Sequence, residues 1–177
     1  MATSSNKSNM DKTFEALLSA DDARILKALA TVDQRGDARS IMPLLNALAK
    51  TSEQKVRQRI TEMLYQVKVS GAVEELMKAL QDPALRSVRR TILATFWNAG
   101  LDVRDQVKQL VAVAVEGDAE ECFECLTVLE HNEFLNDKGV LAGIKLLNAA
   151  IASNTDEYKG AMLGSLLVEL KARVGKD

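Results

Sequence analysis

The stretch SGAVEELMKALQ, residues 70–81, carries the pattern that decides the fold. At about 3.6 residues per helical turn, its apolar residues Leu76, Met77 and Ala79 fall on one side of a helix. Leu76 belongs to a column of leucines that recurs after 32, 34 and 36 residues: Leu44, Leu76, Leu110 and Leu146. One helix face that returns four times at nearly constant spacing indicates an internal repeat.

A second apolar column has the same three spacings and consists of Val56, Val88, Cys122 and Tyr158. Four residues later in each copy, a further column continues the same helix face: Ile60, Ile92, Leu126 and Met162. Two amphipathic helices per repeat cannot bury their apolar stripes alone, so they must stack on the neighbouring pairs. The sequence therefore predicts a stack of antiparallel helix pairs.

These columns predict about ten helices in one solenoid domain over residues 10–177, preceded by a mobile polar tail over residues 1–9. Helices with the first column are expected at residues 38–50, 70–81, 103–116 and 136–152. Helices with the second column are expected at residues 22–34, 52–67, 83–99, 118–131 and 155–174, after a short helix at 10–19.

Residues that begin or end helices fall at these boundaries. Four glycines lie between predicted helices, where a positive φ is useful: Gly36, Gly71, Gly100 and Gly117. Four polar residues stand where N-caps are expected: Asp21, Ser52, Asp82 and Asp118. Start and stop residues therefore agree with the boundaries that the repeat predicts.

The composition favours an all-α protein with an aliphatic core. Apolar residues make up 47% of the 177 residues and aromatic residues only 4%. No apolar run is long enough to span a bilayer, so we expect a soluble protein that does not enter the membrane. Two cysteines three residues apart, without an export signal, favour a reducing compartment, and we expect the protein in the cytoplasm.

The segment Asp82-Pro83, followed by Val88-Arg89, resembles the HEAT-repeat pattern, and the resemblance covers about residues 22–175. It implies a right-handed α-α superhelix of about four HEAT-like helix pairs with terminal capping helices. The resemblance also implies a structural ladder along the stack, formed here by Asp82 and Arg89.

The sequence departs from the HEAT pattern in the neighbouring repeats. Arg57 matches the ladder arginine by the same offset, but Thr51 and Ser52 replace the Asp-Pro pair before it. Phe123 stands where the next arginine would be. The resemblance implies a binding scaffold, although some HEAT-like proteins are DNA glycosylases or bilin lyases. Fold alone does not choose among these functions.

Cys122 and Cys125 form the motif C-F-E-C, which is compatible with a metal or redox site. Zinc would need four ligands, and the chain offers no second cysteine pair and a single histidine, His131. Because Cys122 occupies an apolar column of the repeat, we expect buried thiols and no metal. His131 lies near a predicted helix end, where an imidazole can meet unpaired carbonyls. A capping role is favoured over a catalytic one.

Trp97 and the pair Gly160 and Gly164 each allow two interpretations. Trp97, the single tryptophan, lies at the edge of an apolar stripe, where it can pack against the fold or anchor a partner. Packing is favoured. The G-x-x-x-G spacing of Gly160 and Gly164 favours close packing on the preceding helix, or a groove of small residues at the end of the stack. That end could also mediate homo-oligomerisation.

Charge is unevenly distributed along the chain. Residues 50–108 contain 11 Lys and Arg against 7 acids, whereas residues 116–157 contain 2 against 10. Solvated helix faces explain such charges, or a partner does. A basic ridge for phosphates or an acidic protein is predicted from Arg57, Arg59, Arg86, Arg89, Arg90, Arg104 and Lys108. A net charge of −2, without aromatic residues among the basic ones, argues against nucleic acid.

The sequence thus predicts a non-catalytic scaffold or adaptor that needs no cofactor and binds a protein or peptide. The first contacts are expected on the concave face, between the core leucines: Asn46, Lys78, Lys108, Lys145 and Asn148. The alternatives are a nucleic-acid-binding protein and a small HEAT-like enzyme of the glycosylase or lyase type.

Overall fold

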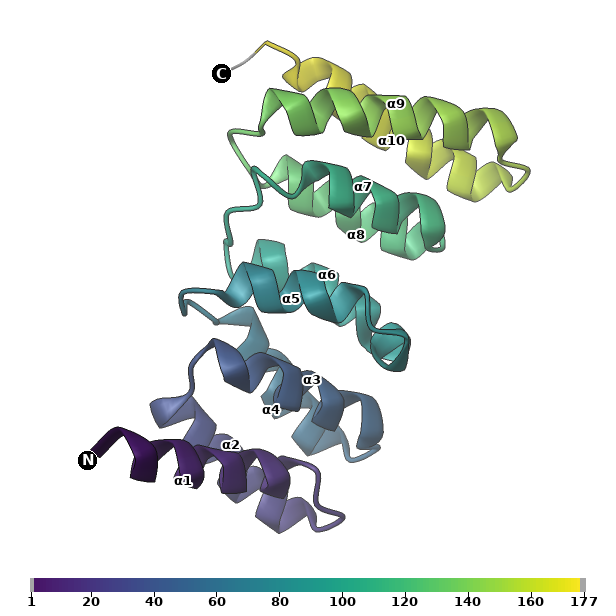
Figure 1. Cartoon of the computed structure of the whole chain (residues 1–177). Helices are drawn as coiled ribbons and strands as arrows, with labels where there is room; N and C mark the ends of the chain where they lie inside the picture. Colours follow the sequence, from purple (N-terminus) through teal and green to yellow (C-terminus); the bar gives the residue numbers. More distant parts are fainter. Residues whose placement is uncertain (1, 176–177) are drawn as a thin grey trace. The chain divides into compact units, whose positions relative to one another are not determined.

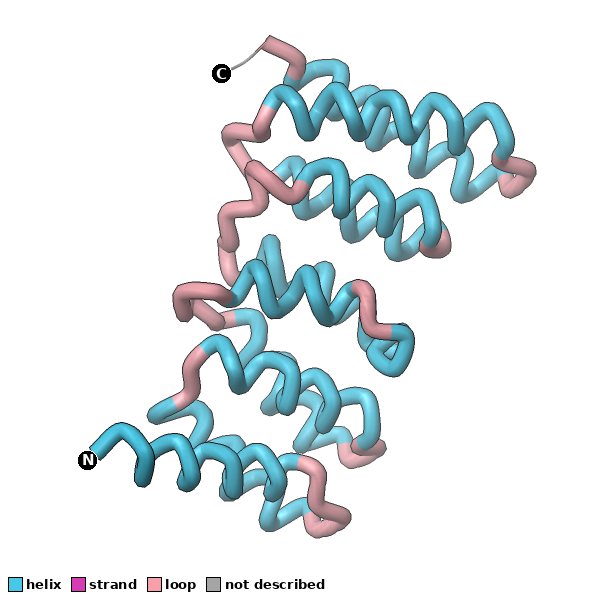
Figure 2. Tube along the Cα trace, in the orientation of Figure 1, coloured by secondary structure: helices cyan, strands magenta, loops and turns pink. Residues whose placement is uncertain are grey.

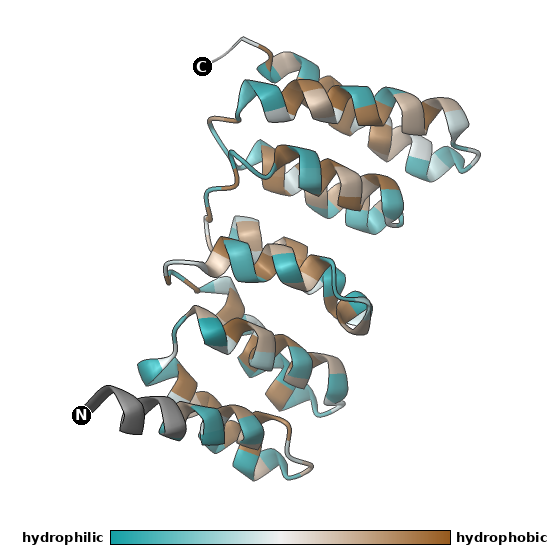
Figure 3. Cartoon of the chain, viewed as in Figure 1, coloured by the Kyte–Doolittle hydropathy of each residue, from teal (hydrophilic) through white to brown (hydrophobic). Residues whose placement is uncertain are grey.

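The structure is a computed structural model that describes the backbone of residues 2–175 and the side chains of residues 9–175. Within these residues the chain forms ten α-helices and two short 3-10 helices, and no strand (Figure 2). Figure 3 shows hydrophobic and hydrophilic residues on the same helices, as expected for amphipathic packing. The prediction of an all-α protein is therefore confirmed.

Across the described part of the chain, no helix is both long and apolar enough to cross a membrane. The contacts between Cα atoms divide the chain into two compact units, Met1–Thr95 and Phe96–Asp177. The division falls inside helix α6 (Arg89–Asn98). The prediction of one solenoid over residues 10–177 stays a prediction.

Unit 1 consists of two layers of helices (Figure 1). Its elements are α1 (Ala2–Leu17), α2 (Asp22–Arg35), η1 (Ala38–Ser40), α3 (Ile41–Lys50), α4 (Gln54–Tyr65), α5 (Ala72–Leu80) and η2 (Pro83–Val88). Helix α3 packs beside α1 and α5 in one layer, while α2 packs beside α4 in the other. Leu45, Ile60 and Leu76 are completely buried. The repeated apolar columns therefore form the core of this unit.

Unit 2 repeats the arrangement with two helix pairs. These are α7 (Val107–Glu116), α8 (Ala119–Glu130), α9 (Asp137–Ser153) and α10 (Glu157–Arg173). Helix α7 packs on α8 and α9, and α10 packs on α8 and α9. Leu110, Cys122 and Leu147 are completely buried in the core. The core prediction is therefore confirmed at these positions, but it is wrong for Tyr158, of which 65% is exposed. Leu126, Leu146 and Met162 are only partly buried.

The predicted N-caps are confirmed at three positions out of four. Asp21, Asp82 and Asp118 accept hydrogen bonds from backbone N–H groups of α2, η2 and α8. The prediction for Ser52 is wrong, because α4 begins one residue later and Glu53 is its N-cap. The Glu53 carboxylate accepts a hydrogen bond from the N–H of Lys55 at 3.4 Å.

A positive φ occurs at two of the four predicted glycines, Gly71 (83°) and Gly100 (60°). The prediction is wrong for Gly36 and Gly117, whose φ values are −67° and −74°. Both positions instead lack space for a side chain. A Cβ at Gly36 would lie 2.6 Å from the carbonyl oxygen of Val32, and one at Gly117 would lie 2.9 Å from Cβ of Glu121.

Helix α1 begins at Ala2, well before the predicted start at residue 10. The tail predicted for residues 1–9 overlaps this helix, and its backbone from Ala2 is helical. Residues 2–9 contain neither glycine nor proline, so a helix can continue backward through them. Met1 and the side chains of residues 2–8 lie outside the described residues, and so do residues 176–177.

Close helix packing occurs on α9 and not at the predicted G-x-x-x-G pair of α10. A Cβ at Gly164 would meet nothing within 4 Å, and one at Gly160 would meet only Asn154. The predicted packing of this pair on the preceding helix is therefore wrong at Gly164, which borders open space. On α9, a Cβ at Gly139 would lie 3.2 Å from Val107 of α7. The small residues of α9 let α7 approach closely.

Candidate binding site

A hollow of about 350 Å³ in unit 2 is lined by the end of α6, the loop that follows it and the loop between α8 and α9. Its lining residues are Phe96, Trp97, Gly100, Leu101, Asp102, Arg104, His131, Asn132, Glu133 and Phe134. The hollow combines aromatic, acidic and basic side chains on two loops. This combination occurs in none of the other hollows described below.

Hydrogen bonds fix both loops in place. The N–H of Leu101 donates to the carbonyl of Phe96 at 2.8 Å, and Gly100 takes the left-handed conformation. This pattern ends helix α6 as a Schellman motif. The N–H of Val103 then donates to the side-chain oxygen of Asn132 at 3.0 Å. The first loop is thereby tied to the second.

Trp97 is half-buried and lies at the base of this arrangement. Its indole Nε1–H donates to Oε2 of Glu124 on α8 at 3.0 Å. The ring lies 5.4 Å from the ring of His131, measured between centroids, at an interplanar angle of 37°. Trp97 is therefore held in one orientation from two sides, which supports the packing interpretation of this residue.

His131 is the C-cap residue of α8, as the sequence predicts. Its Nδ1 lies 2.8 Å from the carbonyl oxygen of Thr127. Because a carbonyl can only accept, Nδ1 carries the proton and donates it. The imidazole thus adds a second hydrogen bond to a carbonyl that already accepts the backbone N–H of His131 at 3.1 Å.

Two of the charged lining residues, Asp102 and Arg104, are paired with each other. Arg104 and Asp102 form an ion pair at 2.7 Å. The hydrogen bond from Arg104 lowers the pKa of Asp102, and the Asp102 carboxylate raises the pKa of Arg104. Arg173 of α10 donates to the backbone carbonyls of Asn132 and Glu133, at 2.8 and 3.0 Å. The rim also carries Phe134, of which 52% is exposed.

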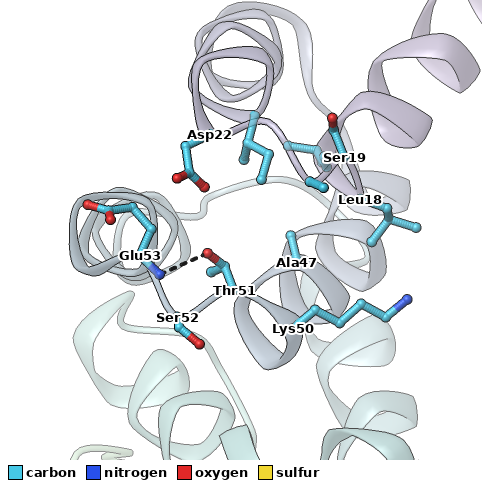
Figure 4. A pocket seen from close by; sticks show the side chains of 11 residues that line it. Leu18, Ser19, Asp22, Ala47, Lys50, Thr51, Ser52 and Glu53 are labelled. Carbon is cyan, nitrogen blue, oxygen red and sulfur yellow. Dashed lines mark hydrogen bonds between the residues drawn. The ribbon is translucent and has the colours of Figure 1, made fainter.

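A second hollow, of about 440 Å³, lies in unit 1 between the α1–α2 loop and the α3–α4 loop (Figure 4). Leu18 and Lys50 lie at its edge, and the N–H of Glu53 donates to Oγ1 of Thr51 at 3.2 Å. The lining is aliphatic and polar without an aromatic ring. It therefore offers fewer groups that would recognise a partner than the hollow at Trp97 does.

A third hollow, of about 500 Å³, runs between α7 and α9 and includes Lys108 and Lys138. Lys108 is one of the residues that the sequence places on the concave face. Lys145 and Asn148 are also exposed, on α9 of the same unit. These three residues remain candidates for partner contacts.

The other two predicted concave-face residues lie in unit 1 and already have partners. Lys78 is exposed and forms an ion pair with Glu75. Asn46 is half-buried, and its amide donates to the carbonyl of Met42 at 2.9 Å. This bond to its own helix leaves Asn46 less available to a partner than the sequence predicts.

The predicted basic ridge contains residues with different roles. Arg57 donates to the carbonyls of Leu48 and Thr51, at 2.6 and 3.1 Å, at the end of α3. Arg86 and Arg90 are exposed in unit 1, whereas Arg104 belongs to the hollow of unit 2. The guanidinium of Arg57 thus serves as a structural cap.

The ladder residues Asp82 and Arg89 both lie in unit 1. Asp82 accepts a hydrogen bond from the N–H of Ala84 at 2.9 Å, and only 4% of Arg89 is exposed. The ladder itself stays a prediction.

The buried-thiol interpretation of the C-F-E-C motif is confirmed. Cys122 and Cys125 are completely buried, and burial raises the pKa of Cys122 to about 11. Among the described residues, no cluster of three or more His, Cys, Asp or Glu is arranged to hold a metal ion. The motif therefore serves the core of unit 2.

Sequence reasoning missed that Trp97 and His131 lie together. The two residues are 34 positions apart, which equals the spacing from Val88 to Cys122. They occupy the same position in successive repeats, and that register could have predicted their contact. The repeat does not predict that Glu124 or Phe134 lies at this site, because the residues at the same position in the neighbouring repeats are neither aromatic nor acidic.

Comparison of this chain with protein-family models, with curated proteins and with solved structures found no match.

Proposed function

We propose that this chain is a non-catalytic scaffold of the HEAT-repeat type that holds a protein or peptide partner on its surface. The repeat spacings of 32, 34 and 36 residues and the two helix layers within each unit support this proposal. In such stacks each pair buries its apolar stripe against the next, in a right-handed superhelix. The proposal places the protein in the cytoplasm, where both thiols stay reduced.

The observation that carries the proposed binding role is the hollow at Trp97. Aromatic side chains contribute strongly to binding when they are held rigidly, since little conformational entropy is then lost. Trp97 is fixed by Glu124 and His131, and the half-exposed Phe134 lines the same hollow. Phe134 thus adds exposed apolar surface to the hollow of the fixed indole, and aromatic residues are enriched at binding surfaces.

The test compares Phe134→Ala with Phe123→Ala in affinity capture followed by mass spectrometry. Phe123 on α8 is a matched control, since 54% of it is exposed against 52% of Phe134. We expect proteins captured by the wild type to be lost or strongly reduced with Phe134→Ala and retained with Phe123→Ala. Equal retention by both variants would contradict the role of the hollow.

The concave-face contacts have a separate test. Lys78→Glu and Lys145→Glu reverse the charge of two exposed residues, one in each unit. If the partner also lies along this face, the double variant should capture less of it than the wild type. Unchanged capture would exclude these two contacts and leave the hollow as the binding surface.

A further inference from the structure

We infer that the hollow at Trp97 binds the cationic side chain of an arginine or lysine from a basic peptide segment. This inference rests on the proposed binding function and adds the chemistry of the partner. Four observations on unit 2 carry it: the aromatic rings, the hydrogen-bond donors already in use, the exposed carboxylate of Glu133 and the excess of acidic residues.

The aromatic rings supply the first attraction. A guanidinium or ammonium group is attracted to the faces of indole and phenyl rings because the ring quadrupole places negative charge there. Trp97 and Phe134 line the same hollow, and the carboxylate of Glu124 lies 3.0 Å from the indole nitrogen. This negative charge beside the ring strengthens the attraction for a cation.

The donors of the hollow are already engaged, which disfavours an anionic partner. Trp97 has a single donor, and Glu124 accepts it. Arg104 faces Asp102 through two short contacts, Nε to Oδ2 at 2.8 Å and Nη2 to Oδ2 at 2.7 Å. Arg173 is bound to Glu169 and to backbone carbonyls. An anion would have to break one of these interactions.

An acceptor remains available on the rim. Glu133 is exposed, and its carboxylate has no ion-pair partner among residues 9–175. A cationic side chain above the rings of Trp97 and Phe134 could therefore form an ion pair there. The aliphatic stem of arginine or lysine would meanwhile cover the apolar rim.

The charge of the whole unit agrees with this partner. Unit 2 contains 14 Asp and Glu against 8 Lys and Arg, a net charge of −6 with His131 neutral. A negative potential raises the local concentration of basic peptides and speeds their association. The acidic segment over residues 116–157 would thus attract the basic partner, which is a function beyond that of a solvated surface.

Trp97 is the single tryptophan of the chain, so its fluorescence reports directly on the hollow. The experiment titrates the full-length protein with three acetylated and amidated pentapeptides of the form Gly-X-Gly-X-Gly. X is arginine in the first, glutamate in the second and norleucine in the third. We expect a saturable change in Trp97 emission with the arginine peptide, which weakens as salt is added.

Variants then locate the binding. We expect Glu133→Gln and Phe134→Ala each to weaken binding of the arginine peptide about three- to tenfold. Glu157→Gln and Phe123→Ala make the same chemical changes elsewhere in unit 2 and should leave the affinity unchanged. All four residues are on the surface, and circular dichroism melts establish that every variant is folded.

The outcomes separate the inference from the proposed function. If the norleucine peptide binds as tightly as the arginine peptide, the hollow binds peptides but the inference of a cationic ligand is overturned. Tighter binding of the glutamate peptide overturns it as well. If none of the three peptides changes the emission of Trp97, both the inference and the role of the hollow are overturned.

Discussion

The guanidinium of Arg57 shows how one residue can have a role that its charge does not reveal. In the sequence it is a member of a basic cluster, whereas in the structure it binds two carbonyls at the C-terminal end of α3. Helix ends leave carbonyls unpaired, and a cation there is doubly favourable because the helix dipole is negative at that end. Both hydrogen bonds come from one guanidinium nitrogen, Nη1, at the tip of the side chain.

Arg57→Lys keeps the positive charge, but its shorter side chain ends before the position of Nη1, the nitrogen that donates to both carbonyls. We expect this variant to lower the free energy of unfolding by about 1 kcal/mol, since the group is half-buried and its charged hydrogen bonds are partly screened. Urea unfolding measures the change, with Arg24→Lys on the exposed face of α2 as control. An equal effect of both substitutions would show that the cap contributes nothing.

Cys122 yields a prediction about pH. Burial disfavours the thiolate and raises the pKa of Cys122 to about 11, against 9.0 for the unperturbed thiol. Because the folded-state pKa is the higher one, this thiol contributes stability fully below about pH 9 and loses it as the pH rises to about 11. We expect slow modification by a disulfide reagent at pH 8 in the native protein and fast modification in urea. Fast modification of the native protein would contradict the burial.

At the scale of helices, close packing requires small residues on α9, although the G-x-x-x-G pattern of the sequence lies on α10. A Cβ at Gly143 of α9 would lie 3.1 Å from Cγ2 of Val111 and 2.9 Å from Cδ1 of Leu170. Val111 is β-branched and cannot turn aside easily. The approach of α7 and α10 to α9 therefore requires a glycine at this position.

The pair Gly143→Val and Gly164→Val tests this requirement. Both changes replace glycine by valine within a long helix, so the helix-propensity contribution is nearly the same in the two variants. We expect Gly143→Val to be less stable than Gly164→Val by about 1–3 kcal/mol, because extra methyl groups overpack the core only at Gly143. Thermal or urea unfolding measures the difference. Equal stability would show that α9 can shift at little cost.

At the scale of the molecule, each unit has a core built from its own helix pairs. Leu45 on α3 and Leu147 on α9 are completely buried at matching places in the two units. In a stack of repeats, each pair gains its stability mainly from its nearest neighbours. A defect in one core should therefore remain local.

Leu45→Ala and Leu147→Ala should each cost about 2–5 kcal/mol through the cavity that they leave. In hydrogen exchange followed by mass spectrometry, we expect Leu45→Ala to speed exchange mainly in α1–α4. Leu147→Ala should speed it mainly in α7–α10. Uniform acceleration along the whole chain with either variant would contradict a modular stack and indicate one cooperative core.

The repeat register made most of the helices predictable. Helix α2 was expected over residues 22–34 and spans Asp22–Arg35, and α9 was expected over 136–152 and spans Asp137–Ser153. Two of the expected ranges were wrong in part: residues 83–88 form the 3-10 helix η2 instead of the start of an α-helix, and the helix expected from residue 103 begins at Val107. The conformation of a glycine was also mispredicted where it depends on space. Gly117 was predicted to adopt a positive φ, yet it is needed because the Glu121 side chain folds back over it in a capping box.

The sequence by itself determined most of the helices and most of their buried faces, because apolar periodicity and capping act over a few neighbouring residues. It also determined which residues could carry charge or stack. Only the tertiary structure decided which of them meet. The hollow joins Trp97 to Glu124 and His131, 27 and 34 residues further along the chain. Such contacts depend on loop conformation and helix packing, to which no local pattern is sensitive.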